Sequence, residues 1–349
     1  MKIMYLIPRF TMGGAERLVL QYAKFAKEQG LDVLVASVVG GGELAKDFTA
    51  LGVKILVNED KFWWSNYQRL KAWLKETKSE IIHSHVFSAD VMGYLLRKKV
   101  IWISTQHNVG QEHSWLRRLV LKYILKQADK VIAVGERVKD FCLRDLGLDS
   151  NKVILIRNGI EITKWQKVSS EDLLTQASLR LAIIGRVEKQ KGHAVLFKAL
   201  AQLKKIDWHL NIYGVGSLES DLKKLAQQLK ITKQITWHGV KADMSVELES
   251  IDIVVQPSLW EGLSLVVMEA MSAGRLVITT PPGGEELLDK QTGLIVPVED
   301  EKALAQAIIW VNEHREEAKI MAQTAQTKIQ KFSLNTHWQE LNNLYHEKD

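Results

Sequence analysis

The sequence predicts an α/β protein built from two doubly wound domains, each with a parallel sheet between layers of helices. Short apolar runs that suit buried parallel strands alternate with segments that repeat apolar residues at helical spacing. The alternation stops near residue 160 and starts again after a polar segment, which indicates a second domain. With 349 residues, 46% of them hydrophobic, the chain is long enough for two cores. We therefore expect domains at 1–160 and 161–332, followed by a helical segment at 333–349.

The first half opens with a strand, a glycine-containing loop and a helix. Residues 2–7, apolar from Ile3 on, predict a strand, and residues 15–29 repeat apolar positions at helical spacing. Gly13 and Gly14 lie between them and would let a phosphate approach the backbone at the helix start, although a Gly-Gly pair is more often an ordinary turn. Further strands are expected at 33–38, 53–57, 81–83, 100–104 and 131–134.

Histidines follow two of these strands, at the ends where doubly wound sheets bind ligands. His83 and His85 are spaced as metal ligands could be, but no third or fourth ligand is close in the sequence, so a metal site is disfavoured. His107 is the better candidate for a binding role, although an isolated histidine is more often a hydrogen-bonded structural residue.

Residues 114–126 have the pattern of a basic amphipathic helix. The apolar stripe consists of Trp115, Leu116, Leu119, Val120, Tyr123 and Ile124, and the charges around it are Arg117, Arg118, Lys122 and Lys126. Packing of the stripe onto the sheet is the more common arrangement, and attachment to an anionic membrane is the alternative. The tryptophans in segment 62–78 support the membrane alternative only weakly.

The second half begins again with a strand, at 181–184. Arg186 and Lys191 follow it, before a helical pattern at 194–203. Two cations between a strand end and a helix start suit a pyrophosphate, although charged loop residues are usually just solvated. The next strand, 210–213, precedes a Gly-Val-Gly run, but Glu219 stands where a dinucleotide fingerprint needs a third glycine, which disfavours an oxidoreductase.

Two carboxylates frame a later strand, turn and helix. A nearly uninterrupted apolar run at 251–255 predicts a buried strand, and a helical pattern starts at Leu265. Free N–H groups at the helix start favour an anion. Glu261 precedes the helix and Glu269 lies inside it, and such groups can bind sugar or ribose hydroxyls, although glutamates at this spacing are usually solvated.

Asn158-Gly159 is a turn, and we place the interdomain linker at 159–179. Strands are expected at 235–238 and 276–279, a rigid turn at 281–284, and a final helix marked by Trp338, Leu341 and Leu344.

Charge and cysteine content limit the partners. The net charge of +6 divides into +9 for residues 1–160, with 25 basic and 16 acidic residues, and −3 for residues 161–349, with 22 and 25. Because no nucleic-acid module or dense basic tract occurs, we expect an anionic acceptor or a membrane surface and no nucleic acid. Cys142 is the only cysteine, and neither a membrane span nor a signal peptide is recognisable. We expect a cytoplasmic location, with peripheral attachment to the inner face of the cell membrane as an open alternative.

Several of these motifs resemble those of one enzyme family. Ser258, the run from Glu261 to Leu265, and Glu269 resemble the Glu-x7-Glu signature of retaining glycosyltransferases of family 4. The Gly-Arg and Lys-Gly pairs at 185–192 resemble the family's donor-phosphate motif. The resemblance implies the GT-B fold, in which two Rossmann-like domains face a central cleft. The first would bind the acceptor, the second the nucleotide sugar, and the final helix would pack back on the first domain.

The resemblance also implies a role for each candidate residue. Arg186 and Lys191 would stabilise the leaving diphosphate, Glu261 would hold the donor sugar, and Glu269 would hold the ribose. His107 would orient the transferring sugar. The other donor-binding positions implied are Gly13, Gly14, Val240, Gly262, Leu263, Ser264 and Leu265. The family often has Gly-Gly-x-x-Glu where this chain reads Gly-Gly-Glu-Glu at 283–286, so the residue in that glutamate's place is open.

The resulting expectation is a retaining hexosyltransferase. It would move a sugar from a nucleotide diphosphate sugar, a UDP-sugar by preference, to a hydroxyl in cell-surface polysaccharide, lipopolysaccharide or lipid-linked saccharide synthesis. Because cationic side chains can neutralise the diphosphate and no Asp-x-Asp motif occurs, neither a metal nor another cofactor is expected. Two alternatives stay open: an inactive sugar-nucleotide-binding regulator, which the intact candidate set disfavours, and a GT-B nucleotide-sugar isomerase.

Overall fold

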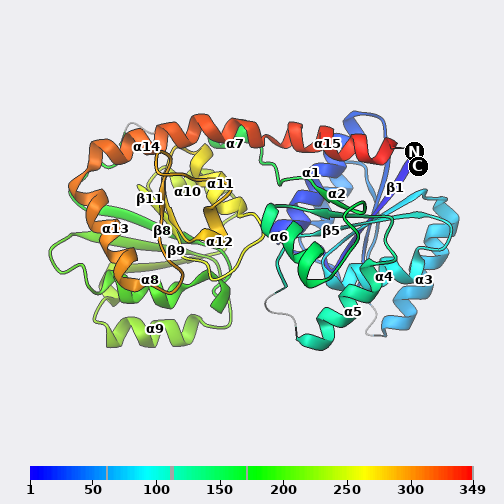
Figure 1. The fold of residues 1–349 in the computed structure, drawn as a ribbon, viewed down its shortest axis with the longest axis horizontal. Helices are drawn as coiled ribbons and strands as arrows, with labels where there is room; N and C mark the ends of the chain where they lie inside the picture. Colours follow the sequence, from blue (N-terminus) through cyan, green and yellow to red (C-terminus); the bar gives the residue numbers. More distant parts are fainter. Residues whose placement is uncertain (60–61, 111–113, 170–171, 348–349) are drawn as a thin grey trace. The chain divides into compact units, whose positions relative to one another are not determined.

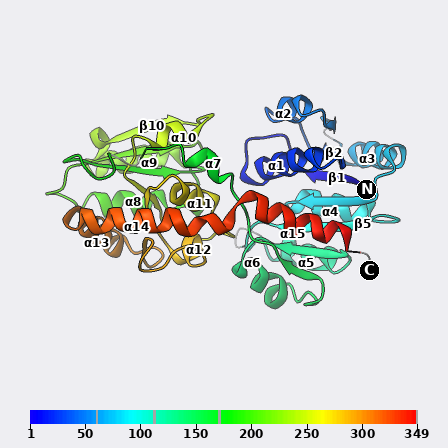
Figure 2. The ribbon, with the colours of Figure 1, turned by 90° about the horizontal axis from the view of Figure 1, so that it is seen from above.

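The computed structural model describes residues 1–59, 62–110, 114–169 and 172–347, and it divides into two compact units. Unit 1 comprises Met1–Arg157 and Trp338–Asp349, and unit 2 comprises Asn158–His337. Each contains one parallel sheet with helices on both faces (Figures 1 and 2). The α/β fold with two doubly wound sheets, predicted from the alternation of strand and helix patterns, is confirmed.

The sheet of unit 1 has seven strands in the order β3-β2-β1-β4-β5-β6-β7. Its strands are β1 (Lys2–Ile7), β2 (Asp32–Ser37), β3 (Lys54–Leu56), β4 (Ile81–His85), β5 (Ile101–Gln106), β6 (Lys130–Ala133) and β7 (Val153–Leu155). Strand order reverses between β1 and β4, and a ligand crevice in such sheets lies at the carboxyl ends beside that reversal. In unit 1, a ligand site is therefore expected at the loops after β1 and β4.

Among the described residues, seven helices accompany this sheet. They are α1 (Gly14–Glu28), α2 (Ala45–Ala50), α3 (Trp63–Thr77), α4 (Phe87–Leu96), α5 (Trp115–Leu125), α6 (Glu136–Asp140), which continues as the π-helical turn η1 (Phe141–Asp145), and α15 (Leu334–His346). α15 begins in unit 2, and from Trp338 on it belongs to unit 1. There the Trp338 ring stacks on Phe25 of α1, with 6.0 Å between centroids.

The sheet of unit 2 has six strands in the order β10-β9-β8-β11-β12-β13, again with a reversal, here between β8 and β11. Its strands are β8 (Leu179–Ile184), β9 (Trp208–Tyr213), β10 (Ile235–Gly239), β11 (Ile253–Gln256), β12 (Leu276–Thr279) and β13 (Leu294–Ile295). The helices are α7 (Ile162–Trp165), η2 (Lys189–Lys191), α8 (His193–Leu200), α9 (Glu219–Gln228), η3 (Thr232–Gln234), α10 (Met244–Leu248), α11 (Leu265–Ser272), α12 (Pro281–Gly284), α13 (Glu301–Glu313), α14 (Arg315–Lys328) and η4 (Ile329–Phe332).

Two local predictions differ from the structure. The segment 159–179, predicted as a linker, is folded into unit 2: it forms α7, and Leu173 and Leu174 are buried in the unit's core. Its polar residues 170 and 171 lie outside the described part. The rigid turn predicted at 281–284 is the short helix α12, because a proline in the first helical turn has no hydrogen bond to lose there. Within the described residues, no helix is both long and apolar enough to span a bilayer.

Candidate functional site

The loops at the strand reversal of unit 2, together with helix α11, carry the two predicted cations and the two predicted acids. β8 and β11 are hydrogen-bonded neighbours, so the loops that leave their carboxyl ends start side by side. The first loop holds Arg186 and Lys191, and the second holds Glu261. It leads to α11, which carries Glu269. The sheet therefore brings both predicted cations to the same edge as the two predicted acids.

Gln190 connects the two loops. Its backbone carbonyl accepts a hydrogen bond from the Leu259 N–H at 2.8 Å, and its side-chain Nε2 donates to the Trp260 carbonyl at 2.9 Å. Its Oε1 accepts from the guanidinium of Arg186 at 3.2 Å. Gln190 is buried, whereas Arg186 is exposed. A neutral, buried side chain thus orients the outer cation and fixes the distance between the loops.

Lys191 and Glu261 form an ion pair at the centre of this arrangement. Lys191 Nζ lies 2.5 Å from Glu261 Oε1, which also accepts a hydrogen bond from Ser258 Oγ at 2.9 Å. Gln190 Nε2 donates to the other carboxylate oxygen at 3.4 Å. Only 13% of the Lys191 side chain and 11% of the Glu261 side chain are exposed, so water screens the pair weakly. Both carboxylate oxygens have donors, which anchors Glu261 in one orientation.

The start of α11 completes this edge. The Ser264 side chain caps the helix by accepting from the Val267 N–H at 3.4 Å, and Leu263 and Ser264 are buried. Gly262 precedes them, Leu265 begins the helix, and the half-buried Glu269 lies one turn further on. The helix has no acidic residue in its first turn, so its positive end is not neutralised from within. An anion is favoured there.

Val240 lies apart from this network. It follows β10, and 62% of it is exposed. Beside it, His238 stacks on Tyr213 with 4.6 Å between ring centroids and bonds to Asn211 at 2.8 Å. The donor-binding role implied for Val240 stays a prediction.

His83, His85 and His107 of unit 1 form a polar cluster, in which His83 and His85 are buried and His107 is half-buried. His107, directly after β5, shares a hydrogen bond with His85, with 2.9 Å between His107 Nε2 and His85 Nδ1. The two ring nitrogens of His83 lie 2.6 Å from the Tyr345 hydroxyl and 2.7 Å from the Thr105 hydroxyl. Within the described ranges, no three potential ligands are grouped as a metal site would need.

A buried carboxyl lies behind this cluster. Asp90 accepts hydrogen bonds from the hydroxyls of Ser84 and Ser104, both at 2.7 Å, and from Gln106 Nε2 at 2.9 Å. Burial raises the pKa of Asp90 to about 6, and these three donors oppose the rise. Because the bonds join β4 and β5, Asp90 holds in place the strand ends from which His85 and His107 project.

Gly13 and Gly14 occupy the start of α1. Gly13 is the residue that precedes the helix, and Gly14 is its first residue. A Cβ on Gly13 would lie 2.2 Å from a carboxylate oxygen of Glu16, so the glycine lets that side chain fold back over the turn. Gly13, Gly14 and His107 belong to unit 1, whereas Arg186, Lys191, Glu261 and Glu269 belong to unit 2.

Sequence reasoning missed Gln190. As an uncharged residue between two predicted phosphate-binding cations, it gave no signal of chemistry, and only its position in the motif could have drawn notice. Asp90 was missed for a related reason: its three hydrogen-bond donors come from two strands, and their proximity depends on strand pairing.

Comparison with known proteins assigns the chain. The model of Glycosyltransferase Family 4 matches residues 12–164, and the model of Glycosyl transferases group 1 matches residues 170–328. The chain belongs to glycosyltransferase family 4. This glycosyltransferase is 25% identical over 279 residues to the UDP-Gal:alpha-D-GlcNAc-diphosphoundecaprenol alpha-1,3-galactosyltransferase of Escherichia coli. The matched region covers 73% of this chain and 72% of that enzyme. It is also 25% identical over 320 residues to the phosphatidyl-myo-inositol mannosyltransferase of Mycolicibacterium smegmatis, covering 86% of this chain and 81% of that one.

The fold of the glycosyltransferase matches solved structures. The crystal structure of Anabaena HepE in complex with UDP and glucose superposes with a TM-score of 0.87 and 20% sequence identity, covering 100% of both chains. The GT-B fold that the motifs implied is confirmed.

Proposed function

We propose that this glycosyltransferase transfers a hexose from a UDP-sugar to a hydroxyl of a lipid-linked saccharide, with retention at the anomeric carbon and without a metal ion. The observation that carries the proposal is the Arg186, Gln190, Lys191 and Glu261 network at the strand reversal of unit 2. The names of relatives support it. The relative from Escherichia coli is named for UDP-Gal and a diphosphoundecaprenol-linked acceptor, and HepE was crystallised with UDP and glucose.

The network has the charge and the free donors that a diphosphate needs. An ammonium group has three N–H donors, and Glu261 takes one from Lys191, which leaves donors for phosphate oxygens. Arg186 adds a guanidinium that can bind phosphate through two parallel hydrogen bonds. Negative charge grows on the diphosphate as the sugar leaves, so these cations stabilise the transition state more than the bound donor. Loss of one such donor typically costs about 10²–10³ in kcat.

The reaction we propose needs no protein side chain as a base. The acceptor hydroxyl attacks the anomeric carbon from the face that the diphosphate leaves, and the new C–O bond forms as the sugar–phosphate bond breaks. The hydroxyl proton goes to an oxygen of the departing phosphate. In this scheme Glu261 holds the sugar, Glu269 holds the ribose and His107 orients the transferring sugar.

A product assay tests the function. The full chain is incubated with UDP-sugars and with diphosphoundecaprenol-linked saccharides, and the product is examined by mass spectrometry and NMR. We expect free UDP and an α-linked product from an α-linked donor, and the same rate with EDTA present. A β-linked product would contradict retention, a changed sugar without released UDP would indicate an isomerase, and binding without turnover would indicate a regulator.

Two variants connect that activity to the network. We expect Lys191→Ala and Glu261→Gln to lower kcat by about 10²–10³, because the first removes a charge from the leaving group and the second removes the anchored acid. Lys189→Ala is the matched control, since Lys189 lies in the same short helix η2 and is exposed. Full turnover in Lys191→Ala would show that Lys191 has no part in the reaction.

A further inference from the structure

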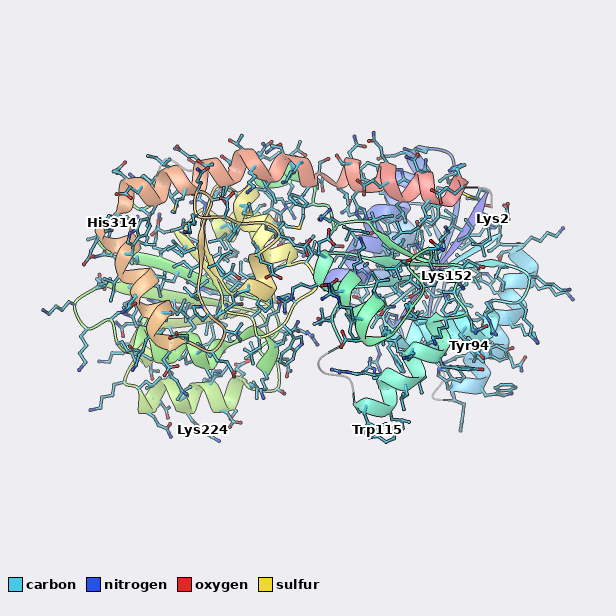
Figure 3. All side chains as sticks on the ribbon, viewed as in Figure 1. Lys2, Tyr94, Trp115, Lys152, Lys224 and His314 are labelled. Atoms are coloured by element: carbon cyan, nitrogen blue, oxygen red, sulfur yellow. The ribbon has the colours of Figure 1, made fainter. Side chains whose placement is uncertain are left out.

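Helix α5 presents apolar side chains to solvent. The exposed fractions are 73% for Trp115, 54% for Leu119 and 62% for Tyr123. Leu116 and Val120, also exposed, flank these three. At about 100° per residue, the five occupy one continuous side of the helix. Figure 3 shows Trp115 at the outer margin of unit 1, directed away from its sheet. Of the stripe predicted from the sequence, only Ile124 is buried, so packing onto the sheet is not what the structure shows.

The opposite side of α5 holds the helix in place. Leu121, Ile124 and Leu125 are buried, and Ser114 caps the start by accepting from the Arg117 N–H at 3.3 Å. At the other end, Lys152 Nζ donates to the carbonyls of Lys126 and Ala128, at 3.0 and 2.9 Å. These contacts anchor α5 on unit 1. Its apolar residues are therefore exposed while the helix is folded and packed.

Positive charge borders this apolar side. Arg118, Lys122 and Lys126 follow one edge of α5, and the helix contains no acidic residue. The C-terminal end of α4 lies alongside, where the rings of Tyr94 and Tyr123 are 5.9 Å apart and the Arg97 guanidinium lies 3.9 Å from the Tyr94 centroid. The exposed residues Lys98 and Lys99 follow Arg97. The apolar side thus lies among cations from two helices.

We infer that α5 is the surface by which this glycosyltransferase docks on an anionic lipid bilayer. Aromatic and aliphatic side chains favour the boundary between headgroups and acyl chains, and the basic edge is attracted to anionic headgroups. A second copy of the chain fits less well, because a symmetric pair would bring two basic edges together. The inference rests on the proposed function, since a lipid-linked acceptor lies in a bilayer.

Vesicle co-sedimentation of the full chain tests the surface. We expect the wild type to pellet with vesicles of phosphatidylcholine and phosphatidylglycerol, more weakly with phosphatidylcholine alone, and less as salt rises. The triple variant Trp115→Ser, Leu119→Ser, Tyr123→Ser should stay in the supernatant. Ile320→Ser is the control, since Ile320 is 62% exposed on α14. Unchanged circular dichroism and melting temperature would show that the triple variant is folded.

A second variant tests the charges. Each basic residue near an anionic surface contributes about 1 kcal/mol, so Arg118→Gln, Lys122→Gln, Lys126→Gln should weaken binding to the anionic vesicles by about 10² and leave binding to neutral vesicles unchanged. Equal sedimentation of wild type and both variants would overturn the inference. A dimer of the wild type that the Trp115 triple variant abolishes, without vesicle binding, would assign α5 to self-association and also overturn it.

Activity measurements separate this inference from the proposed function. Vesicle binding needs no donor, so binding without transfer would leave the surface in place and refute the enzyme proposal. Turnover of a short-chain, water-soluble acceptor without vesicle binding would refute the surface alone. If the protein both binds vesicles and transfers the sugar, the Trp115 triple variant should lose activity on vesicle-embedded acceptor and keep activity on the soluble acceptor.

Discussion

At Gly192, the backbone itself explains the choice of residue. Its φ is +71°, in the left-handed region, and a Cβ there would lie 2.0 Å from the carbonyl oxygen of Pro257. The glycine therefore lets the loop after β8 contact the loop after β11. That contact holds Lys191 beside Glu261. In the Lys-Gly pair of the motif, Lys191 therefore supplies the charge and Gly192 supplies the backbone conformation that positions it.

Substitution of Gly192 by alanine should destabilise the protein in two ways, through the left-handed φ and through the close approach to the Pro257 carbonyl. Gly239→Ala is the matched control, because Gly239 lies in the same unit with φ of +68° and, its chain neighbours aside, no atom of the described residues lies within 4 Å of the added Cβ. We expect a loss of unfolding free energy of about 1–2 kcal/mol for Gly239→Ala and about 1–3 kcal/mol more for Gly192→Ala. Urea unfolding measures both, and equal losses would contradict the close approach at Pro257.

His193 should make stability depend on pH. It is 2% exposed, and among the described residues neither ring nitrogen has a hydrogen-bond partner. Burial, and secondarily the charge of Lys191, lower the pKa of His193 from 6.5 to about 4. The unfolded chain binds a proton at His193 more readily than the folded chain does. The contribution of the neutral, buried imidazole to the free energy of unfolding is therefore fully present above pH 6.5 and is lost as the pH falls toward 4. Urea unfolding at pH 7 and pH 5 should therefore show an acid-induced loss about 2 kcal/mol smaller in His193→Leu than in the wild type. Equal losses in the two proteins would contradict a buried neutral imidazole.

The sequence pointed to the charged candidate residues, but it did not point to the residues that hold them in place through hydrogen bonds. The resemblance to glycosyltransferase family 4 pointed to Arg186, Lys191, Glu261 and Glu269; the structure brings their loops to one edge of the sheet, and their roles stay a prediction. Gln190 and Asp90 act through hydrogen bonds to groups on other strands or loops, and no sequence pattern gives those distances.

At the scale of elements, one buried carboxylate fixes the start of unit 2. Asp252, just before β11, accepts hydrogen bonds from the Leu174 and Arg180 N–H groups at 2.8 and 2.9 Å and pairs with the Arg180 guanidinium at 2.7 Å. This bonding explains why the predicted linker is folded: apolar residues and a carboxylate from elsewhere in the unit hold it.

Asp252→Asn should destabilise unit 2. The variant keeps the shape of the side chain and leaves the half-buried Arg180 without its counter-charge, so we expect a loss of about 3 kcal/mol of unfolding free energy. Asp221→Asn is the same change in an exposed pair with Lys224, and it should cost no more than about 0.5 kcal/mol. Chemical denaturation at neutral pH measures both. Similar small losses would mean that the Asp252 pair does not hold the segment.

The order of strands and helices was largely predictable because parallel strands buried on both faces leave uninterrupted apolar runs. The orientation of α5 was not. The helix has apolar residues on two sides, and the larger set faces solvent while Leu121, Ile124 and Leu125 face the core. Periodicity identifies an amphipathic helix, but it does not say which of two apolar sides the sheet covers.

At the scale of the whole molecule, the two units have different chemistry. Unit 2 has the paired cations, the anchored acid and the start of α11, which has no acidic residue in its first turn, whereas unit 1 has the histidine cluster and the outward side of α5. The charge difference between the halves of the sequence agrees with this division, since the basic half contains α5. Donor binding and membrane docking should therefore be separable by mutation.

Calorimetric titration of UDP into the full chain tests the central claim most directly. The claim is that unit 2 binds the donor diphosphate through Arg186 and Lys191. The wild type and the Lys189→Ala control should bind UDP with the same affinity, and the Arg186→Ala, Lys191→Ala double variant, folded by circular dichroism, should bind at least about 10²-fold more weakly, because each lost charge-assisted contact costs about 1.5–3 kcal/mol. Wild-type affinity in the double variant would contradict the account.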